Sequence, residues 1–520
     1  MAEYWVNNLI GSDSGAGTEN DPWFTVPGLT GANAVIAGDI INVRNGTTQA
    51  GRLNVPANNL TYRGYGLADN VLELRLPMSG APFITCTQRI MRDPGVHEGM
   101  WILDGTAVDL DGSVNTGIRT GVVIEDMQLY GSQIGSRHAM TLATSAANVS
   151  GFTLRRFEIV GAAGRGITGN TKSLLIELGR ITHTKDDNIG LNAWAANGYR
   201  AGSVDVLRDL ELIEPNRITL GAGDTGSAGD HLHLQPADGR WDGSLDAQRI
   251  RCSKTTGAKQ AAVLHATAAD SVIRLRDWSL GGGGDCQILV GHIKGIIDIQ
   301  RIHAVDWATE ALPLFRFAAA DTNPQTWAMD TGSVLRIKNV LAKGVTPSFY
   351  RSVDTEGART FDGLIEIENN TILGTNITGS ALAVFEFWSA SDLASIGVNF
   401  QLRLRNNVCA ISDKPQVKIP SGMDGDARYQ IEGNRTSAGT YQVGETTYTD
   451  IAAFEAAHSY ATDNSEGDPM VTAQGIPLTG SPLIGAGIHT EYKTDITGKA
   501  FYNPPSIGAY EYERPRIPRT

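Results

Sequence analysis

A short alternation of apolar and polar residues recurs many times along the 520-residue chain. Copies such as residues 124–131 and 207–214 alternate with a period of two, which predicts β-strands that bury one face. The steps between copies vary from 22 to 40 residues. The equivalent apolar position of the copies is occupied by Met127, Phe157, Gly179, Leu210, Ile250, Trp278, Ile302, Val340, Thr371 and Val408.

The segments between the copies are punctuated by Gly, Asn and Asp and contain no amphipathic helix. Strands that recur once per unit without intervening helices bury their apolar rows by stacking as parallel coils. The pattern therefore predicts an all-β fold, a parallel β-helix of roughly ten or more coils. A β-propeller fits less well, because its blades need four strands at a steadier period of roughly 40–50 residues.

The charge and the cysteines of the chain narrow its possible partners. The 43 basic and 56 acidic residues leave a formal net charge of −13, which argues against nucleic-acid binding. No apolar run approaches roughly 18–20 residues, so no membrane insertion is expected. The four cysteines show no CxxC spacing, which favours buried free thiols over a disulfide or a metal site. We expect no cofactor.

Both ends of the chain carry distinctive segments. The start contains GSDSGAGT, DPW and AGDIINVRNG, all within residues 11–46. Near the end, Thr449 or Asp450 is expected to be the N-cap of a short helix. The phrases SPLIGAG and DITGKAFYNPPSIGAYEY follow within residues 481–512.

These segments resemble the opening and closing segments of right-handed parallel β-helix proteins of the pectate-lyase-like superfamily. The resemblance covers nearly the whole chain and implies that fold. It divides the chain into an N-terminal cap with the first coils at 1–100, a β-helix body at 101–440 and a closing segment with a short helix at 441–520. The superfamily hosts lyases, hydrolases, adhesins and phage tailspikes, so the resemblance alone does not select an activity.

A second short strand follows the repeated one in the central coils. Aligning Met140, Ile167, Ile189, Leu232, Ala262 and Ile288 places a column of other residues two positions earlier. Neighbours in such a column lie about one strand spacing apart. Asp187 and Asp230 are then adjacent, Arg165 lies beside them, and Asp186 precedes Asp187 in sequence. The whole column comprises His138, Arg165, Asp187, Asp230, Gln260 and Cys286.

Paired carboxyl groups of this kind are the groups that glycoside hydrolysis needs, one protonated as the acid and one ionised. The phrase KDDNIGLN resembles the GDDCIAI strand of polygalacturonase-type hydrolases, which implies catalytic roles for Asp186, Asp187 and Asp230. The chain departs from that pattern, because Arg165 stands where an NTDG coil would be and neither GHG nor RIK follows. A structural interpretation also stays open, since Asp residues at turns often bind backbone amides.

Two other chemistries use the same region. A lyase would need a base such as Arg165 or Lys185, often with Ca²⁺ held by carboxylates. His231 and His233 could hold zinc together with His265 or His292, but no third ligand at a fixed spacing supports that site. A role for His231 and His233 in contacting a sugar is the stronger hypothesis.

Aromatic and basic residues in the following loops are candidates for substrate binding. Trp194 and Tyr199 follow the Asp186–Asp187 strand, and Trp241 follows the next coil. Their rings could stack on sugars, with Arg200 beside them. Packing within the loops is the equal alternative, whereas Trp278 occupies the apolar position of the repeat and is expected in the core.

The sequence therefore predicts a virion-associated protein, similar to a tailspike or tail fibre, that recognises a bacterial surface polysaccharide. Cleavage of that glycan by hydrolysis is the expected activity, if the chain is an enzyme. The start MAEYWVNNLIG has no signal-peptide character, which agrees with assembly in a phage-infected cell. Resemblance to tailspikes implies a homotrimer and other virion proteins as partners. The alternatives are a secreted or periplasmic bacterial polysaccharide lyase or hydrolase, which the SPLIGAG ending favours, and a non-enzymatic adhesin or structural virion protein.

Overall fold

A computed structural model describes most of the chain. The described residues are 1–29, 31–44, 53–65, 72–78, 81–88, 100–102, 108–109, 120–130, 138–142, 149–162, 164–184, 186–192, 203–213, 229–234, 243–253, 260–266, 268–281, 287–307, 313–317, 328–344, 349–352, 361–374, 383–387, 396–411, 415–419, 428–437, 439–491 and 493–512.

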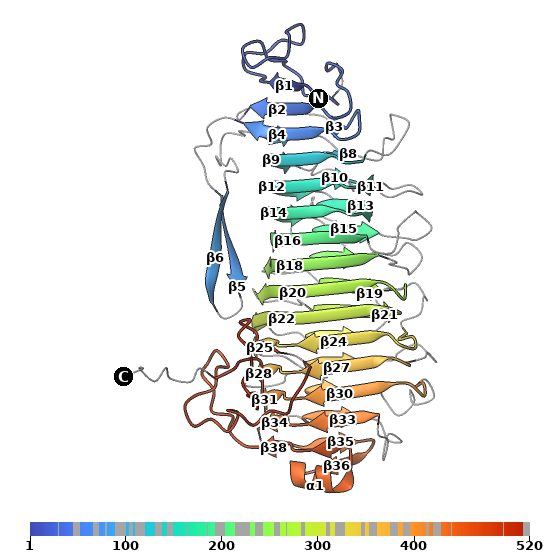
Figure 1. The fold of residues 1–520 in the computed structure, drawn as a ribbon, viewed down its shortest axis with the longest axis vertical. Helices are drawn as coiled ribbons and strands as arrows, with labels where there is room; N and C mark the ends of the chain where they lie inside the picture. Colours follow the sequence, from blue (N-terminus) through green and yellow to red (C-terminus); the bar gives the residue numbers. More distant parts are fainter. Residues whose placement is uncertain are drawn as a thin grey trace, which may run out of the picture. The chain divides into compact units, whose positions relative to one another are not determined.

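The described chain is almost entirely β-structure and divides into two compact units. Unit 1 comprises residues 1–77 and 83–273, and unit 2 comprises residues 78–82 and 274–520. Figure 1 shows that each unit is a stack of coils, and nearly all strand pairs within its sheets are parallel. The predicted parallel β-helix is confirmed, whereas the predicted boundaries at residues 100 and 440 stay a prediction.

In unit 1, two parallel sheets line opposite parts of each coil. The strands of the first sheet are β1 (Glu3–Val6), β2 (Ile40–Arg44), β4 (Thr61–Tyr65), β7 (Met100–Ile102), β9 (Val123–Tyr130), β12 (Thr153–Ala162), β14 (Leu175–Thr184), β16 (Val204–Ile213) and β18 (Ser244–Ser253). The strands of the second are β3 (Leu53–Asn54), β8 (Val108–Asp109), β10 (Met140–Thr141), β11 (Val149–Ser150), β13 (Ile167–Lys172), β15 (Ile189–Asn192), β17 (Leu232–Leu234) and β19 (Gln260–Ala266). A separate two-stranded sheet joins β5 (Leu72–Met78) to β6 (Ala81–Gln88).

Unit 2 repeats this arrangement, and its first-sheet strands are mostly split in two. These strands are β20 (Val272–Gly281, which begins at the end of unit 1), β22 (Ile296–Trp307), β24 (Val334–Lys338), β25 (Leu341–Gly344), β27 (Leu364–Glu368), β28 (Thr371–Leu373), β30 (Gln401–Arg405), β31 (Val408–Ala410), β33 (Tyr429–Glu432), β34 (Arg435–Thr436), β37 (Ala461–Thr462) and β38 (Ser465–Glu466). Those of the second sheet are β21 (Gln287–Ile293), β23 (Phe315–Phe317), β26 (Tyr350–Ser352), β29 (Phe385–Glu386), β32 (Val417–Ile419), β35 (Tyr441–Val443) and β36 (Thr446–Tyr448).

A single left-handed residue bends each first-sheet strand in the repeated pattern. Asp126, Arg156 and Leu178 have φ near +50 to +60° in unit 1, and Asn339 and Asn369 do the same in unit 2. The residue that follows each of them is buried in the coil interior. This bend explains why the inward position recurs although the loops between copies differ in length.

Strand register confirms the predicted column from Met127 through Phe157, Gly179 and Leu210 to Ile250. In unit 2 the predicted column is wrong by one residue at its last two members. Leu341 pairs with Thr371, and Thr371 pairs with Val408, so the residues equivalent to Val340 are Asn370 and Asn407. The alignment failed there because buried asparagines occupy positions that the other copies fill with apolar residues.

These asparagines form a buried ladder along unit 2. The Nδ2 group of Asn370 donates to Oδ1 of Asn407 at 2.9 Å, and Nδ2 of Asn407 donates to Oδ1 of Asn434 at 2.9 Å. Asn434 continues the ladder to Asn464 at 2.8 Å. Asn407 also donates to the backbone oxygen of Ile367, so the ladder joins the strand bends of successive coils.

The closing segment packs along the side of unit 2. It contains helix α1 (Ile451–Ala457), whose N-cap Asp450 accepts a hydrogen bond from the backbone N–H of Ala453. Val408 packs with Leu483 and Ile507, and Leu341 packs with Ile496, Ala509 and Tyr510. No helix in the described part of the chain has the length and the apolar composition needed to cross a bilayer.

Candidate functional site

Strand register in unit 1 confirms the second predicted column. Met140 pairs with Ile167, Ile167 with Ile189, Ile189 with Leu232, and Leu232 with Ala262. The residues two positions earlier therefore follow one another on successive coils, at or just before the start of each strand. They are His138, Arg165, Asp187, Asp230 and Gln260, whereas Cys286, the last member of the predicted column, lies outside the described residues.

One carboxylate oxygen of each column aspartate holds the next coil. Oδ1 of Asp187 accepts a hydrogen bond from the backbone N–H of Asp230 at 2.9 Å. Oδ1 of Asp230 accepts one from the backbone N–H of Gln260 at 3.0 Å. The turn role weighed from sequence is therefore present, and it uses only one oxygen of each carboxylate.

The remaining oxygens converge on two cations. Oδ2 of Asp187 lies 2.8 Å from Nε of Arg165 and 3.6 Å from Nδ1 of His233. Oδ2 of Asp230 lies 3.1 Å from the same His233 nitrogen, and Oδ2 of Asp186 lies 3.3 Å from Nε of Arg165. These five residues are called the carboxylate cluster below.

Glycines make room for this arrangement. Gly190 pairs with His233, and a Cβ atom on Gly190 would lie 2.8 Å from Cδ of Arg165. A Cβ atom on Gly229 would lie 2.4 Å from the backbone carbonyl of Asp186. Because side chains at either position would push the cluster apart, these two glycines are functional candidates. Neither glycine was predicted from sequence, although Gly229 directly precedes Asp230.

Burial and charge interactions lower the pKa of Asp187 and raise the pKa values of Asp186 and Asp230. Burial would raise the pKa of Asp187, but hydrogen bonding to His233 and the charges of His233 and Arg165 lower it below its usual value. Burial and the nearby Asp187 charge raise the pKa of Asp230 to about 6. Burial, followed by Asp187, also raises the pKa of Asp186.

His233 is the charged centre between the two buried carboxylates. Burial opposes its protonation, yet the contacts with Asp187 and Asp230 raise the pKa of His233 to about 10. His138 differs, because burial and the charge of Arg165 lower its pKa to about 4. At neutral pH the cluster therefore contains a histidine cation, and His138 at its edge is neutral.

Exposure separates the residues that a ligand could reach from those that support them. The Asp186 side chain is 31% exposed and that of Arg165 is 16% exposed, whereas Asp187 is 2% exposed. Thr184 donates from Oγ1 to the backbone oxygen of Asp186 and so positions this turn. Asp186 and Arg165 consequently form the accessible face of the carboxylate cluster.

The other predicted binding residues have different positions. His231 is fully buried, and its Nδ1 lies 3.1 Å from Nδ2 of Asn188, so its ring packs inside the coil. Four predicted binding residues lie outside the described residues: Trp194, Tyr199, Arg200 and Trp241. Trp278 is fully buried in the core, as predicted.

A metal ion would have to use the same groups. Among the described residues, Asp187, Asp230 and His233 offer ligand atoms within 4.8 Å of one another, and His231 is not part of this set. Binding a metal ion there would require the neutral imidazole of His233, whereas the two carboxylates raise the pKa of this histidine to about 10.

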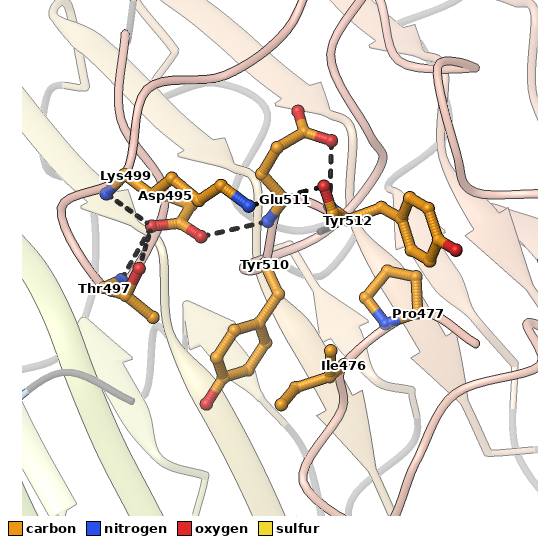
Figure 2. A pocket seen from close by; sticks show the side chains of 8 residues that line it. All are labelled: Ile476, Pro477, Asp495, Thr497, Lys499, Tyr510, Glu511 and Tyr512. Atoms are coloured by element: carbon orange, nitrogen blue, oxygen red, sulfur yellow. Dashed lines mark hydrogen bonds between the residues drawn. The ribbon is translucent and has the colours of Figure 1, made fainter. Parts of the chain in front are cut away.

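Unit 2 contains a pocket of about 310 Å³ in the closing segment. Figure 2 shows that the carboxylate of Asp495 accepts hydrogen bonds from Thr497, Lys499 and Glu511. The Glu511 carboxylate in turn accepts a hydrogen bond from the backbone of Tyr512. Both carboxylates are committed to holding the segment together, so this pocket is primarily a structural feature.

Comparisons with known proteins yielded similarities of fold. No family model and no curated protein matches the chain. A structure of XylC with xylose aligns over 98% of each chain at 10% identity, with a TM-score of 0.47. A mannuronic acid specific polysaccharide family 6 lyase from human gut microbiota aligns over 90% of this chain and 92% of its own at 11% identity, with a TM-score of 0.43.

A third structure is a tailspike protein, gp49 of Acinetobacter baumannii bacteriophage Fri1, described as a capsular polysaccharide depolymerase. It aligns over 79% of this chain and 57% of its own at 9% identity, with a TM-score of 0.31. At such identities the likeness does not transfer an activity or a substrate to this chain. The strand register of the chain itself shows that the protein is a parallel β-helix.

Proposed function

We propose that this protein binds a bacterial surface polysaccharide and cleaves its glycosidic bonds by hydrolysis at the carboxylate cluster. The observation that carries the proposal is the opposite displacement of the pKa values of neighbouring aspartates. Asp187 is held ionised, whereas Asp186 and Asp230 hold protons more tightly than usual. Carboxyl groups whose environments push their pKa values apart are suited to separate acid and base roles.

We assign a role to each aspartate from the extent of its burial. Asp187 and Asp230 are too deeply buried for both to touch a sugar, which changes the pairing expected from sequence. Asp186 is accessible and has a raised pKa, so it is the candidate proton donor to the leaving oxygen. Asp187 supplies the ionised carboxylate as base or nucleophile, and Asp230, whose pKa is raised to about 6, contacts His233. Arg165 orients Asp186 and Asp187 toward each other.

The test measures reducing ends released from bacterial capsule, O-antigen and exopolysaccharide preparations. Asp186→Asn, Asp187→Asn and Asp230→Asn should each reduce cleavage, because each replaces an ionisable carboxyl by a neutral amide. Asp246→Asn serves as the matched control, since Asp246 lies outside the cluster and an amide oxygen can still accept from Gln248. Full activity in Asp187→Asn would remove the cluster from the mechanism.

A lyase mechanism is the second candidate, favoured by the position of Arg165 between Asp186 and Asp187. In β-elimination a cation neutralises the carboxylate of a uronic acid while a base removes the adjacent proton. The same assay separates the two reactions. A lyase product is unsaturated and absorbs ultraviolet light, whereas hydrolysis releases reducing ends without that absorbance. Binding without any product in wild type and variants would indicate an adhesin or another recognition module.

We also propose that the protein acts in a phage tail as a homotrimer. The support is its β-helical body together with an acidic, cysteine-poor composition. Mass spectrometry of purified particles should detect the protein together with tail proteins. Light scattering after size-exclusion chromatography should give three times the 55.5 kDa of one chain. Recovery from the medium or periplasm of a bacterium that carries no phage would favour the secreted alternative.

A further inference from the structure

Two arginines on neighbouring coils of unit 2 lie side by side on the outer face of its second sheet. Arg316 lies in β23 between Phe315 and Phe317, which are fully buried. Because side chains alternate along a strand, Arg316 points outward. It pairs in register with Arg351 of β26, so the two side chains start about 4.8 Å apart.

The column that contains these arginines has an excess of positive charge. Arg351 pairs with Glu386, which pairs with Lys418, so four successive coils present three cations and one carboxylate. Oε2 of Glu386 lies 3.0 Å from Nε of Arg351. Within the described part of the chain, no carboxylate forms an ion pair with Arg316.

Two other arginines of unit 2, Arg336 and Arg403, form ion pairs with a carboxylate. On the outer face of the first sheet, Glu366 contacts Arg336 at 2.7 Å and Arg403 at 2.9 Å. These two guanidinium groups share the Glu366 carboxylate, whereas burial and the charge of Arg351 lower the pKa of Arg316. Among the residues that the structure describes, the surroundings of Arg316 therefore disfavour its charge. Such an arrangement is typical of binding sites, where a ligand provides the missing counter-charge.

We propose that Arg316 and Arg351 bind the oxyanion group of an acidic sugar residue, a carboxylate or a sulfate, in the glycan that the protein recognises. The proposal deepens the proposed function, on which the identification of the ligand as a glycan rests. Guanidinium groups present paired N–H donors that match the two oxygens of such a group. Two of them on adjacent coils can hold one oxyanion between them. An otherwise acidic protein would thereby select acidic polysaccharides.

The experiment compares binding of three polymers by affinity electrophoresis. These probes are polygalacturonate, dextran sulfate and neutral dextran, each at low and at physiological salt. Wild type should bind at least one acidic polymer, more weakly as salt increases, and should not bind dextran. Arg316→Gln should weaken binding about tenfold, and Arg316→Lys should restore part of it. Lys343→Gln is the control, because it removes an equal charge elsewhere in unit 2.

A thermal measurement distinguishes a binding site from a structural one. Arg316→Gln should raise the melting temperature of the ligand-free protein, because the substitution removes a half-buried cation beside Arg351. The acidic polymer should stabilise wild type more than it stabilises the variant. A lower melting temperature together with unchanged binding would overturn the proposal. Binding of polygalacturonate alone identifies a carboxylate, and binding of dextran sulfate alone identifies a sulfate.

The result of the binding test is independent of the result of the test for hydrolysis. Loss of cleavage in Asp187→Asn tests the carboxylate cluster of unit 1, whereas loss of polymer binding in Arg316→Gln tests the acidic site of unit 2. Binding that depends on Arg316 without cleavage of any glycan would support the acidic site and refute hydrolysis. Cleavage of a neutral glycan without binding of either acidic polymer would refute the acidic site and leave hydrolysis intact.

Discussion

At the scale of single residues, the carboxylate cluster shows that structural and chemical roles can share one side chain. Asp187 and Asp230 each use one oxygen to hold the backbone of the next coil and the other to contact His233. The backbone bond fixes the orientation of the carboxylate and thereby the distance between the two charges. A turn residue and a candidate catalytic residue are therefore compatible descriptions of the same aspartate.

The charge of His233 makes a prediction for the pH dependence of stability. Its pKa is raised from 6.5 to about 10 in the folded protein, so the folded state binds more protons than the unfolded state between these values. The stabilisation is complete below pH 6.5 and should decrease as pH rises toward 10. His233→Gln should remove this slope in urea unfolding measured across that range.

His303 offers the matched control for this measurement. Burial lowers the pKa of His303 to about 4, so both its folded and its unfolded forms are neutral above pH 7. His303→Gln should therefore leave the alkaline slope unchanged. An identical slope in His233→Gln and wild type would contradict the ion pairs described for the cluster.

Gly179 makes a second residue-scale prediction. A Cβ atom at this position would lie 2.1 Å from the ring of Phe157 on the preceding coil. Gly179→Ala should lower the free energy of unfolding by about 1–3 kcal/mol through overpacking. Phe157→Leu in the same chain should recover part of that loss, which a double-mutant cycle in urea would measure.

Gly281→Ala is the control for this substitution. The nearest atom to a Cβ at Gly281 is the backbone oxygen of Val305 at 3.4 Å, an ordinary contact distance. Its effect should stay within about 0.5 kcal/mol. Equal effects of the two glycine substitutions would contradict the overpacking expected between a Cβ atom at Gly179 and the ring of Phe157.

At the scale of elements, the left-handed bend and the inward residue after it define each coil. In unit 1 the inward residue is apolar or glycine, and dispersion contacts fill the interior. In the last coils of unit 2 it is asparagine, and a ladder of hydrogen bonds replaces those contacts. Apolar residues and asparagines occupy the same backbone position in different coils. A polar residue at this position therefore does not indicate a strand on the surface.

The asparagine ladder predicts a large effect for a single substitution. Asn407 is fully buried and donates to both Asn434 and the backbone oxygen of Ile367. Asn407→Ala removes the side-chain donor to the Ile367 oxygen and the Oδ1 acceptor of Asn370, and it should lower the free energy of unfolding by about 2–4 kcal/mol. Asn20→Ala, at an exposed position, should change it by less than about 0.5 kcal/mol in the same assay. Similar values for both variants would show that the ladder contributes no net stability.

At the scale of the whole molecule, contacts between successive coils dominate the fold. Each coil contacts mainly its neighbours, so stability depends on local interfaces and not on one central core. The chain also divides into two compact units, and the carboxylate cluster and the Arg316–Arg351 pair lie in different ones. The two candidate sites can therefore be altered independently.

This organisation predicts unfolding in more than one step. Denaturant unfolding followed by hydrogen exchange and mass spectrometry should show separate transitions for the two units. Gly179→Ala should shift the transition of unit 1, and Asn407→Ala should shift that of unit 2. A single transition that both substitutions move equally would show that the 520 residues unfold cooperatively.

The alternation of residues two positions apart was sufficient to predict much of this protein. It determined the strands, their parallel stacking and the columns that place Arg165, Asp187 and Asp230 on successive coils. These features depend on local periodicity and on the repeat of one backbone unit, both of which are visible in sequence. The same reasoning failed at Asn370 and Asn407, because it equated the inward position with an apolar residue.

Only the tertiary structure decided which charged side chains contact one another. His233, for which contact with a sugar stays a prediction, lies between Asp187 and Asp230, and this position depends on the register of successive coils. Burial and pairing, which set each pKa, are likewise properties of neighbours distant in sequence. The same holds for Arg316, because the register of its strand decides that Arg351 lies beside it.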